Sequence, residues 1–156
     1  MSTKNETAST ASREITATRV FDAPRELVFD AWTDPVHISN WWGPVGFTTT
    51  TKRMDARPGG VWDHIMHSPD GTSYEGRIVY VDVTRPERLV YDHVNAPRFR
   101  STSTFEDVGG KTRLSVTLVF ASAEDEQVAK KHGAVEGLIQ MLARLSEELA
   151  RGGKGA

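Results

Sequence analysis

The 156-residue chain has the length of one domain, and its composition, 38% hydrophobic and 26% charged, is that of an ordinary globular protein. A formal net charge of −2 argues against a nucleic-acid partner, and the absence of cysteine excludes disulfides, thiolate metal sites and a cysteine nucleophile. Residues 1–12 lack the apolar stretch of a secretory signal, and no run approaches the roughly 20 apolar residues that span a membrane. We therefore expect a cytoplasmic protein without membrane insertion.

The first part of the chain predicts one strand followed by two short helices. In residues 13–21, apolar residues alternate with polar and β-branched ones, which is typical of a strand. Residues 22–35 repeat apolar side chains at helical spacing, with Asp22 expected to cap the helix and Pro24 to lie in its first turn. A second short helix follows, and the Gly-Pro pair at 43–44 ends it.

Six further strands are predicted, in residues 47–54, 61–67, 73–83, 87–94, 98–108 and 111–120. Short turns separate them, such as SPDG at 68–71 and the Gly-Gly pair at 109–110. Because strands joined by short turns pair in antiparallel order, we expect one antiparallel sheet.

A long helix is predicted from about Glu124 to Ala150. One broad apolar face of this helix contains Val128, Val135, Leu138, Met141, Leu142, Leu145 and Leu149. Because that face must cover the sheet, the chain is predicted to form a single α+β domain over residues 13–150. Disordered segments are expected at 1–12 and 151–156, which are rich in small and polar residues.

Several short motifs occur in a characteristic order and spacing. They are FDAPRELVFDAWTDP at 21–35, WWGP at 41–44, RPGGVW at 57–62, SPDG at 68–71, RPERLVY at 85–91 and GGKTRLSV at 109–116. From about Arg13 to Leu149, the chain resembles the START-like, helix-grip superfamily. Within it, the chain is most similar to the family of homologues of the activator of the ninety-kilodalton heat-shock protein's ATPase.

This resemblance implies a curved antiparallel sheet of about six to seven strands wrapped around a long C-terminal helix, with two short helices after the first strand. It also implies a cavity between sheet and helix that commonly accepts an apolar or amphipathic small molecule. Relatives elsewhere in the superfamily carry lipids, bind plant hormones or cyclise polyketides, so the fold does not settle the activity.

Strand alternation and helical spacing select the side chains that we expect to line this cavity. They are Trp62, His64, Met66, Tyr91, His93, Ser101, Ser103 and Phe105 from the strands, and Leu138, Met141 and Leu142 from the long helix. Trp42 is expected at the cavity rim and Trp41 in packing, because adjacent helical side chains point about 100° apart. Each residue taken alone could simply fill the core. Together, the aromatic rings, hydroxyls and imidazoles favour a pocket, because a plain core avoids polar atoms without partners.

The preferred function is non-covalent binding of an apolar or aromatic small molecule, lipid-like or polyketide-like, in this cavity. An enzyme of the cyclase, dehydratase or hydrolase type remains an alternative, with His64, His93 or Tyr91 as general acid or base, or with Ser101 or Ser103 as a nucleophile beside His93. The family name suggests a third hypothesis, a chaperone-partner module of the stress response. A homodimer formed through the apolar arc of the long helix also stays open.

Neither a metal ion nor a cofactor is expected. His64 and His67 lie on opposite faces of their strand, and no inward carboxylate completes a ligand set with His64 and His93. The glycine pairs at 59–60 and 109–110 lie in turns between strands, whereas a nucleotide-binding loop precedes a helix.

Overall fold

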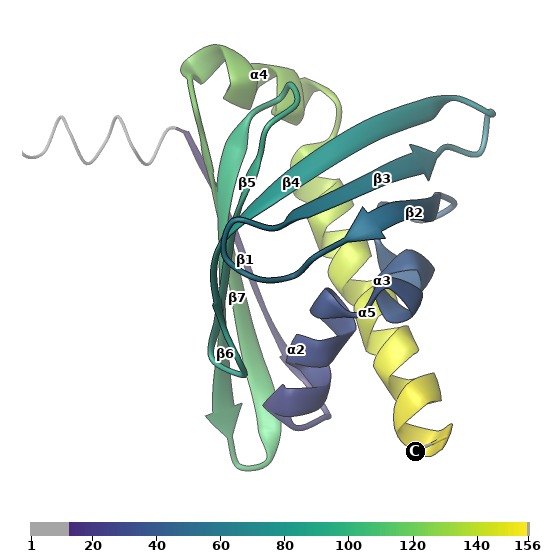
Figure 1. Cartoon of the computed structure of the whole chain (residues 1–156), viewed down its shortest axis with the longest axis vertical. Helices are drawn as coiled ribbons and strands as arrows, with labels where there is room; N and C mark the ends of the chain where they lie inside the picture. The colour runs from purple at the N-terminus through teal and green to yellow at the C-terminus, as the bar shows by residue number, and fades with distance from the viewer. Residues whose placement is uncertain (1–12, 156) are drawn as a thin grey trace, which may run out of the picture.

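One antiparallel sheet curves around the helices of this α+β fold, as Figure 1 shows. The computed structural model describes residues 13–155, so the predicted disordered segment at 1–12 and residue 156 lie outside it. In chain order the elements are β1 (Glu14–Phe21), α2 (Arg25–Thr33), α3 (Pro35–Trp41), β2 (Thr48–Met54), β3 (Val61–His67), β4 (Ser73–Thr84), β5 (Arg88–His93), β6 (Phe99–Val108), β7 (Lys111–Phe120), α4 (Ala123–Lys131) and α5 (Ala134–Gly155). The predicted fold class is confirmed, with seven strands in the sheet.

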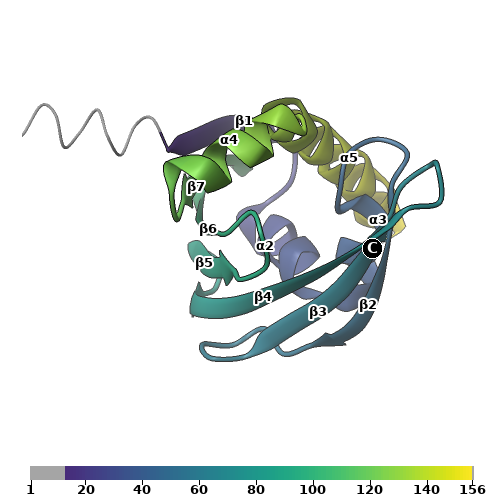
Figure 2. The ribbon, with the colours of Figure 1, turned by 90° about the horizontal axis from the view of Figure 1, so that it is seen from above.

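The strands lie in the order β1-β7-β6-β5-β4-β3-β2, and every neighbouring pair is antiparallel. The register shifts between Thr51 and Arg53 in β2 and between Tyr80 and Asp82 in β4. Such irregularities bend a strand and increase its twist, which favours a curved sheet. Figure 2 shows the sheet curving around α2 and α3, while α5 runs along the open side and packs against both β1 and α3.

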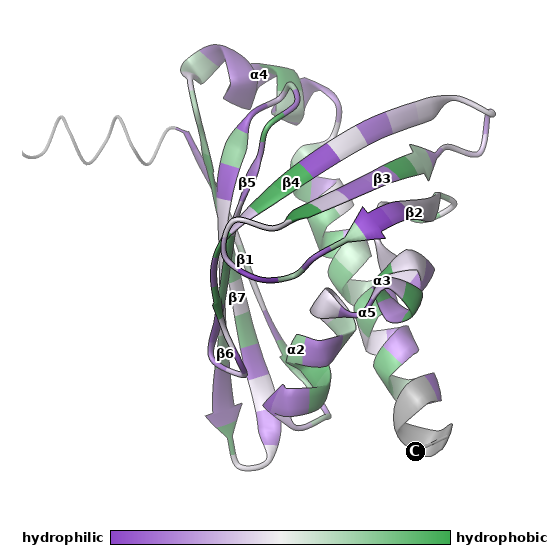
Figure 3. Ribbon diagram, viewed as in Figure 1, coloured by the Kyte–Doolittle hydropathy of each residue, from purple (hydrophilic) through white to green (hydrophobic). Residues whose placement is uncertain are grey.

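The strands bury one face and leave the other toward water. In β7 the alternate residues Leu114, Val116, Leu118 and Phe120 are buried, while the three residues between them are half-buried. Figure 3 shows a comparable alternation of hydrophobic and hydrophilic residues along the strands. Because strand side chains alternate with a period of two, the inner face could be inferred from the sequence.

Helix α2 begins differently from the sequence prediction. Pro24 is the residue that precedes the helix, and its carbonyl accepts from the N–H groups of Leu27 and Val28. No side chain caps α2, so the predicted cap at Asp22 is wrong. Helix α3, by contrast, has a side-chain cap, since Asp34 accepts from the amides of Val36 and His37 at 2.8 and 3.2 Å.

The predicted long helix is two helices, and this part of the prediction is wrong. Gly133 separates α4 from α5 and adopts a left-handed φ of 78°. Val128 and Val135, which lie on either side of this break, are 44% and 45% exposed instead of facing the sheet. A left-handed residue redirects the chain, so an apolar periodicity that continues across it no longer describes one face.

Helix α5 keeps the rest of the predicted apolar face. Leu138, Leu142 and Leu145 are buried, and Met141 and Leu149 pack against the core while remaining partly exposed. The helix is assigned through Gly155, beyond Ala150 where the sequence predicted its end and into the expected tail.

The break at Gly133 can be tested by replacing it with alanine. A Cβ at this position meets no atom within 4 Å, so Gly133→Ala suffers only the backbone cost of a left-handed φ. We expect it to lower the free energy of unfolding by about 1 kcal/mol in urea denaturation. The matched control is Gly137→Ala in the first turns of α5, where a Cβ makes only an ordinary contact with Pro44. Gly137→Ala should instead raise the free energy of unfolding by up to about 1 kcal/mol, because alanine favours a helix more than glycine does. Equal effects of the two substitutions would show that α4 and α5 behave as one helix.

Candidate functional site

The ring of Trp42 lies at the centre of an aromatic cluster on the inner side of the sheet. Its centroid lies within 6.4 Å of the ring centroids of Trp62, Trp41, Trp32, His64 and Tyr91. Most of these contacts are edge-to-face, the arrangement that aromatic quadrupoles favour. Trp42 thereby connects helices α2 and α3 to strands β3 and β5.

The backbone around Trp42 is held by Arg144 of helix α5. Its Nη1 donates to the carbonyls of residues 42, 43 and 44 at 3.2, 2.9 and 3.0 Å, and its Nη2 donates to the carbonyl of Asn40 at 3.2 Å. Thr49 Oγ1 donates to the Trp42 carbonyl as well, at 3.1 Å. These carbonyls belong to the C-terminal end of α3, where a cation is favourable. Burial lowers the pKa of Arg144, yet an arginine stays charged.

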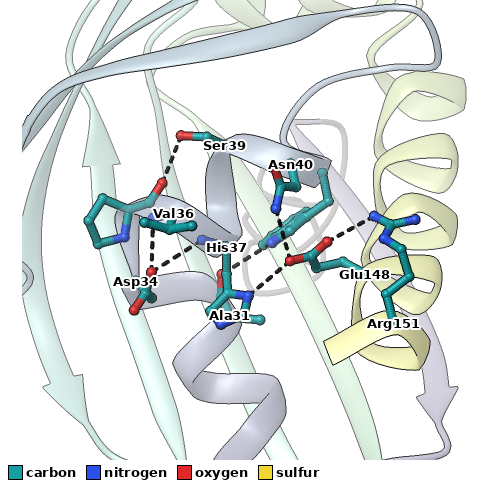
Figure 4. Close-up of polar contacts among 10 residues, drawn as sticks. Ala31, Asp34, Val36, His37, Ser39, Asn40, Glu148 and Arg151 are labelled. Carbon is teal, nitrogen blue, oxygen red and sulfur yellow. Dashed lines mark hydrogen bonds and ion pairs between the residues drawn. The ribbon is translucent and has the colours of Figure 1, made fainter. Parts of the chain in front are cut away.

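A second contact between α3 and α5 is built around Glu148, which is buried (Figure 4). Its carboxylate accepts from His37 Nδ1 at 2.9 Å, Asn40 Nδ2 at 3.1 Å and Arg151 Nη2 at 2.8 Å. Burial alone would raise the pKa of this carboxyl group, but the hydrogen bonds together lower it. Sequence reasoning missed Arg144 and Glu148. The signal that could have found them is their spacing: Arg144 and Glu148 are four residues apart on the long helix, on either side of the buried Leu145 in the sequence.

His64 is buried and fitted between an aromatic ring and a glycine. Its imidazole stacks on Trp62 with centroids 3.8 Å apart, and it lies opposite Gly76 of β4 in the register. A Cβ at Gly76 would lie 2.6 Å from His64 Nε2, so only glycine leaves room for the ring. Desolvation, assisted by the nearby His93, lowers the pKa of His64 to about 4. His64 is therefore neutral near pH 7, and its Nδ1 has no hydrogen-bond partner among the described residues.

His93 is half-buried and has a defined proton position. Its Nδ1 lies 3.0 Å from the carbonyl oxygens of both Asn95 and Pro97. Because carbonyl oxygens only accept, Nδ1 carries the proton in the neutral ring, and Nε2 keeps a free lone pair. The ring stacks on Phe99 at 4.9 Å, and burial lowers its pKa.

The hydroxyls of Ser101 and Ser103 are fully buried and have no hydrogen-bond partner among residues 13–155. Ser101 lies opposite Tyr91 in the sheet, and Ser103 lies opposite Leu89. Burial raises the pKa of Tyr91 to about 12, and the neighbouring Ser101 hydroxyl partly offsets that effect without adopting hydrogen-bond geometry. A buried hydroxyl without a partner costs about 1–3 kcal/mol, so these two serines are unusual.

The remaining predicted residues lie around this cluster. Phe105 is buried against Phe29, with ring centroids 5.1 Å apart. Met66 and Met141 are only partly buried, whereas Leu138 and Leu142 are buried on α5. The structure thus brings Trp42, Trp62, His64 and Tyr91 into direct contact. His93 stacks on Phe99 and lies close enough to His64 to lower the pKa of that histidine.

The described part of the chain shows neither a metal-binding cluster nor a membrane-spanning helix. No group of three or more His, Cys, Asp or Glu side chains there is placed to hold a metal ion. In the same residues, no helix combines the length and the apolar character needed to cross a membrane.

Comparisons with known proteins agree on the fold. The sequence model of one family, described as Activator of Hsp90 ATPase homolog 1-like protein, matches residues 22–150. Among solved structures, a Nitrosomonas europaea protein is 20% identical with a TM-score of 0.85, covering 92% of this chain and 98% of that one. A Mycobacterium smegmatis protein is 26% identical with a TM-score of 0.80, and the match covers 90% of this chain and 92% of that one. An AHSA1-like protein from Aeromonas hydrophila is 22% identical with a TM-score of 0.74, and the match covers 90% of this chain and 94% of that one. No curated protein matches the chain significantly.

The fit between Gly76 and His64 can be tested with a double-mutant cycle. Gly76→Ala should lower the free energy of unfolding by about 1–3 kcal/mol, because the added Cβ overlaps the imidazole. In a His64→Ala background the same substitution should cost less than about 1 kcal/mol, since the ring is gone. Urea denaturation of the four proteins measures the coupling. The same cost in both backgrounds would mean that His64 does not require the glycine.

The burial of His64 also predicts a pH dependence of stability. The folded pKa of about 4 lies below the ordinary value of 6.5, so between these values the unfolded chain binds a proton that the folded protein does not. Lowering the pH from 6.5 toward 4 should therefore reduce the free energy of unfolding. In the His64→Gln variant, this reduction in the free energy of unfolding should be smaller than in the wild-type protein by roughly 2–3 kcal/mol. His93 acts in the same direction and remains in the variant, so the two pH profiles are compared rather than one alone. Parallel profiles would contradict the assignment.

Proposed function

The chain belongs to the family of Activator of Hsp90 ATPase homolog 1-like proteins, and from this premise we propose that it binds an apolar or aromatic small molecule non-covalently. Family and fold make it a domain of the ligand-binding or partner-binding kind. The proposed site lies between the inner face of the sheet and helix α5. Its polar contacts come from His64, His93, Ser101 and Ser103, and its apolar walls come from Trp42, Trp62, Met66, Tyr91, Phe105, Leu138, Met141 and Leu142.

The observation that carries this proposal is the set of buried polar atoms without partners. Most buried polar residues are satisfied within the protein: Thr49 and Thr112 donate to backbone carbonyls, Glu126 pairs with Lys130, and Glu148 is held by its three donors. In the described chain the unpaired atoms are His64 Nδ1, the hydroxyls of Ser101 and Ser103, and the indole N–H of Trp32 on α2.

The histidine and the two serines all project from the inner face of the sheet. An alanine or valine there would avoid the cost of an unpaired polar group. A ligand that supplies the missing partners therefore accounts for their presence, because a few polar groups among apolar walls are typical of a small-molecule site.

We place the entrance of the site at the loop formed by residues 43–47. This loop touches α5 through the Val45 amide, which donates to Gln140 Oε1 at 3.0 Å. It touches the sheet through Phe47, whose ring centroid lies 6.2 Å from that of Tyr74. Val45 and Tyr74 are both exposed apolar side chains. Arg144 holds the carbonyls of Gly43 and Pro44, so the exposed tip of the loop around Val45 is the part that can move aside at a smaller cost than the buried cluster behind it.

A second candidate function is general acid–base catalysis on the bound molecule, of the cyclisation or dehydration type. Its support is His93, whose protonated Nδ1 is held by two carbonyls while Nε2 keeps the lone pair that a general base requires. Tyr91, whose hydroxyl stays protonated, would serve as the acid. The two candidates differ in one result: a carrier releases its ligand unchanged, and an enzyme releases a product that disappears in His93→Ala.

The proposal predicts that removing the two unpaired hydroxyls weakens ligand binding without lowering the stability of the fold. Ser101→Ala combined with Ser103→Ala should leave the free energy of unfolding unchanged, or raise it by about 1 kcal/mol per hydroxyl, because an unsatisfied group is lost. It should also weaken binding of a neutral aromatic probe, 2-naphthol, measured by isothermal titration calorimetry. Native mass spectrometry of the gently purified protein looks for a ligand that is already bound.

The matched control is Thr112→Val. Thr112 is also fully buried, but its hydroxyl donates to the Ala23 carbonyl at 2.8 Å. Its loss should therefore cost about 1 kcal/mol of stability and leave binding of 2-naphthol unchanged. If the double serine variant is instead destabilised as much as Thr112→Val and binds 2-naphthol normally, the hydroxyls are structural. The partner-binding interpretation then becomes the better one.

A further inference from the structure

The interior formed by the described residues contains no unengaged charged side chain that could neutralise a charged ligand. Among the described residues, no lysine or arginine is buried, and the two buried carboxylates are Glu126 and Glu148. Glu126 pairs with Lys130 at 2.6 Å, and Glu148 accepts from residues of α3 and α5. Neither carboxylate is left to bind a cationic ligand.

Arg144 is a half-buried cation beside the tryptophan cluster, and it is already engaged. Its two terminal nitrogens donate to the four carbonyls of residue 40 and residues 42–44. An anion that recruited this guanidinium would leave those carbonyls without their donor at the end of α3, which is unfavourable for buried backbone groups. Arg144 therefore positions the loop and is not available as an anion site.

The unpartnered groups are all uncharged hydrogen-bonding groups. The hydroxyls of Ser101 and Ser103 can each donate and accept. His64 is neutral near pH 7 because burial lowers its pKa to about 4. Tyr91, opposite Ser101, stays protonated because burial raises its pKa to about 12. Such groups complete the hydrogen bonds of a hydroxyl or carbonyl oxygen, but they do not offset a full charge removed from water.

We propose that the interior site selects uncharged ligands that carry a hydroxyl or carbonyl oxygen, and discriminates against carboxylates of the same shape. This inference rests on the proposed binding function and names the chemical class of its ligand. A phenol, alcohol or ketone exchanges its hydrogen bonds with water for bonds to Ser101, Ser103 or His64. A carboxylate, including that of a free fatty acid, loses its hydration and finds no cation, so it binds weakly or only as the neutral acid.

The test compares three probes that share one ring system, each titrated into the wild-type protein by calorimetry. At pH 7.5 a naphthol hydroxyl is protonated, as a tyrosine is, and a naphthoic acid is ionised. The probes are 2-naphthol, 2-naphthoate and methyl 2-naphthoate, and the ester keeps the carboxyl shape without its charge. The buffer contains about 0.15 M salt, which screens the exposed arginines of the outer surface. We expect 2-naphthol and the ester each to bind at least about tenfold more tightly than 2-naphthoate, because a desolvated unpaired charge costs more than the free energy of a tenfold change.

The possible results separate this inference from the function on which it rests. Equal or tighter binding of 2-naphthoate would overturn the charge selection while leaving the binding function intact. An ester that binds as weakly as the carboxylate would also overturn it, because shape rather than charge would then decide. If neither neutral probe binds, and native mass spectrometry finds no bound molecule, the proposed binding function fails and the ligand class fails with it.

Discussion

The carbonyl oxygen of Trp42 accepts hydrogen bonds from both Arg144 and Thr49, and the inner side of the fold depends on this group. The two bonds tie the end of α3 to α5 and to β2. With its backbone held there, the indole ring of Trp42 reaches the rings of Trp62 and Tyr91 on two different strands. The helices and the sheet therefore share one aromatic cluster, and its position is set by polar contacts at its edge.

Among the described residues, the only buried charged side chains are Glu126 and Glu148, and both are paired, whereas the other charged side chains are exposed or half-buried. The solvent-facing side of the sheet carries short arginine–aspartate pairs, in which Arg53 and Arg77 contact Asp63, Arg88 contacts Asp82, and Arg100 contacts Asp92. Exposed pairs of this kind contribute only about 0–1 kcal/mol each, so they do not explain the stability of the fold. The interior instead holds aromatic rings and neutral polar groups. The same desolvation lowers the pKa of His64 and raises that of Tyr91, which keeps both uncharged.

The unpaired polar atoms on the inner face lower the stability of the fold. Ser101, Ser103 and His64 each leave a hydrogen-bonding atom unsatisfied, as does the indole N–H of Trp32, whereas Thr49, Thr112, Glu126 and Glu148 find partners. A stable protein tolerates a few such groups because the large apolar core offsets them, and they concentrate where function requires them. Gly76 adds to this pattern, since its missing side chain leaves the space that the His64 ring occupies.

The sequence by itself determined the class of the fold, the seven strands and the residues of the inner face, because strand periodicity is local and a shift by one residue would bury the polar side. That is why strand alternation alone identified Ser101 and Ser103 as inward-facing. The tertiary structure decided which polar groups find partners. The bonds of Arg144 join residues about 100 positions apart. The break at Gly133 likewise escaped the sequence, because a glycine is tolerated inside a helix and the apolar periodicity continues across the position that takes a left-handed φ. Local patterns specify which way a side chain faces, but partners distant in the chain are chosen only when the elements come together.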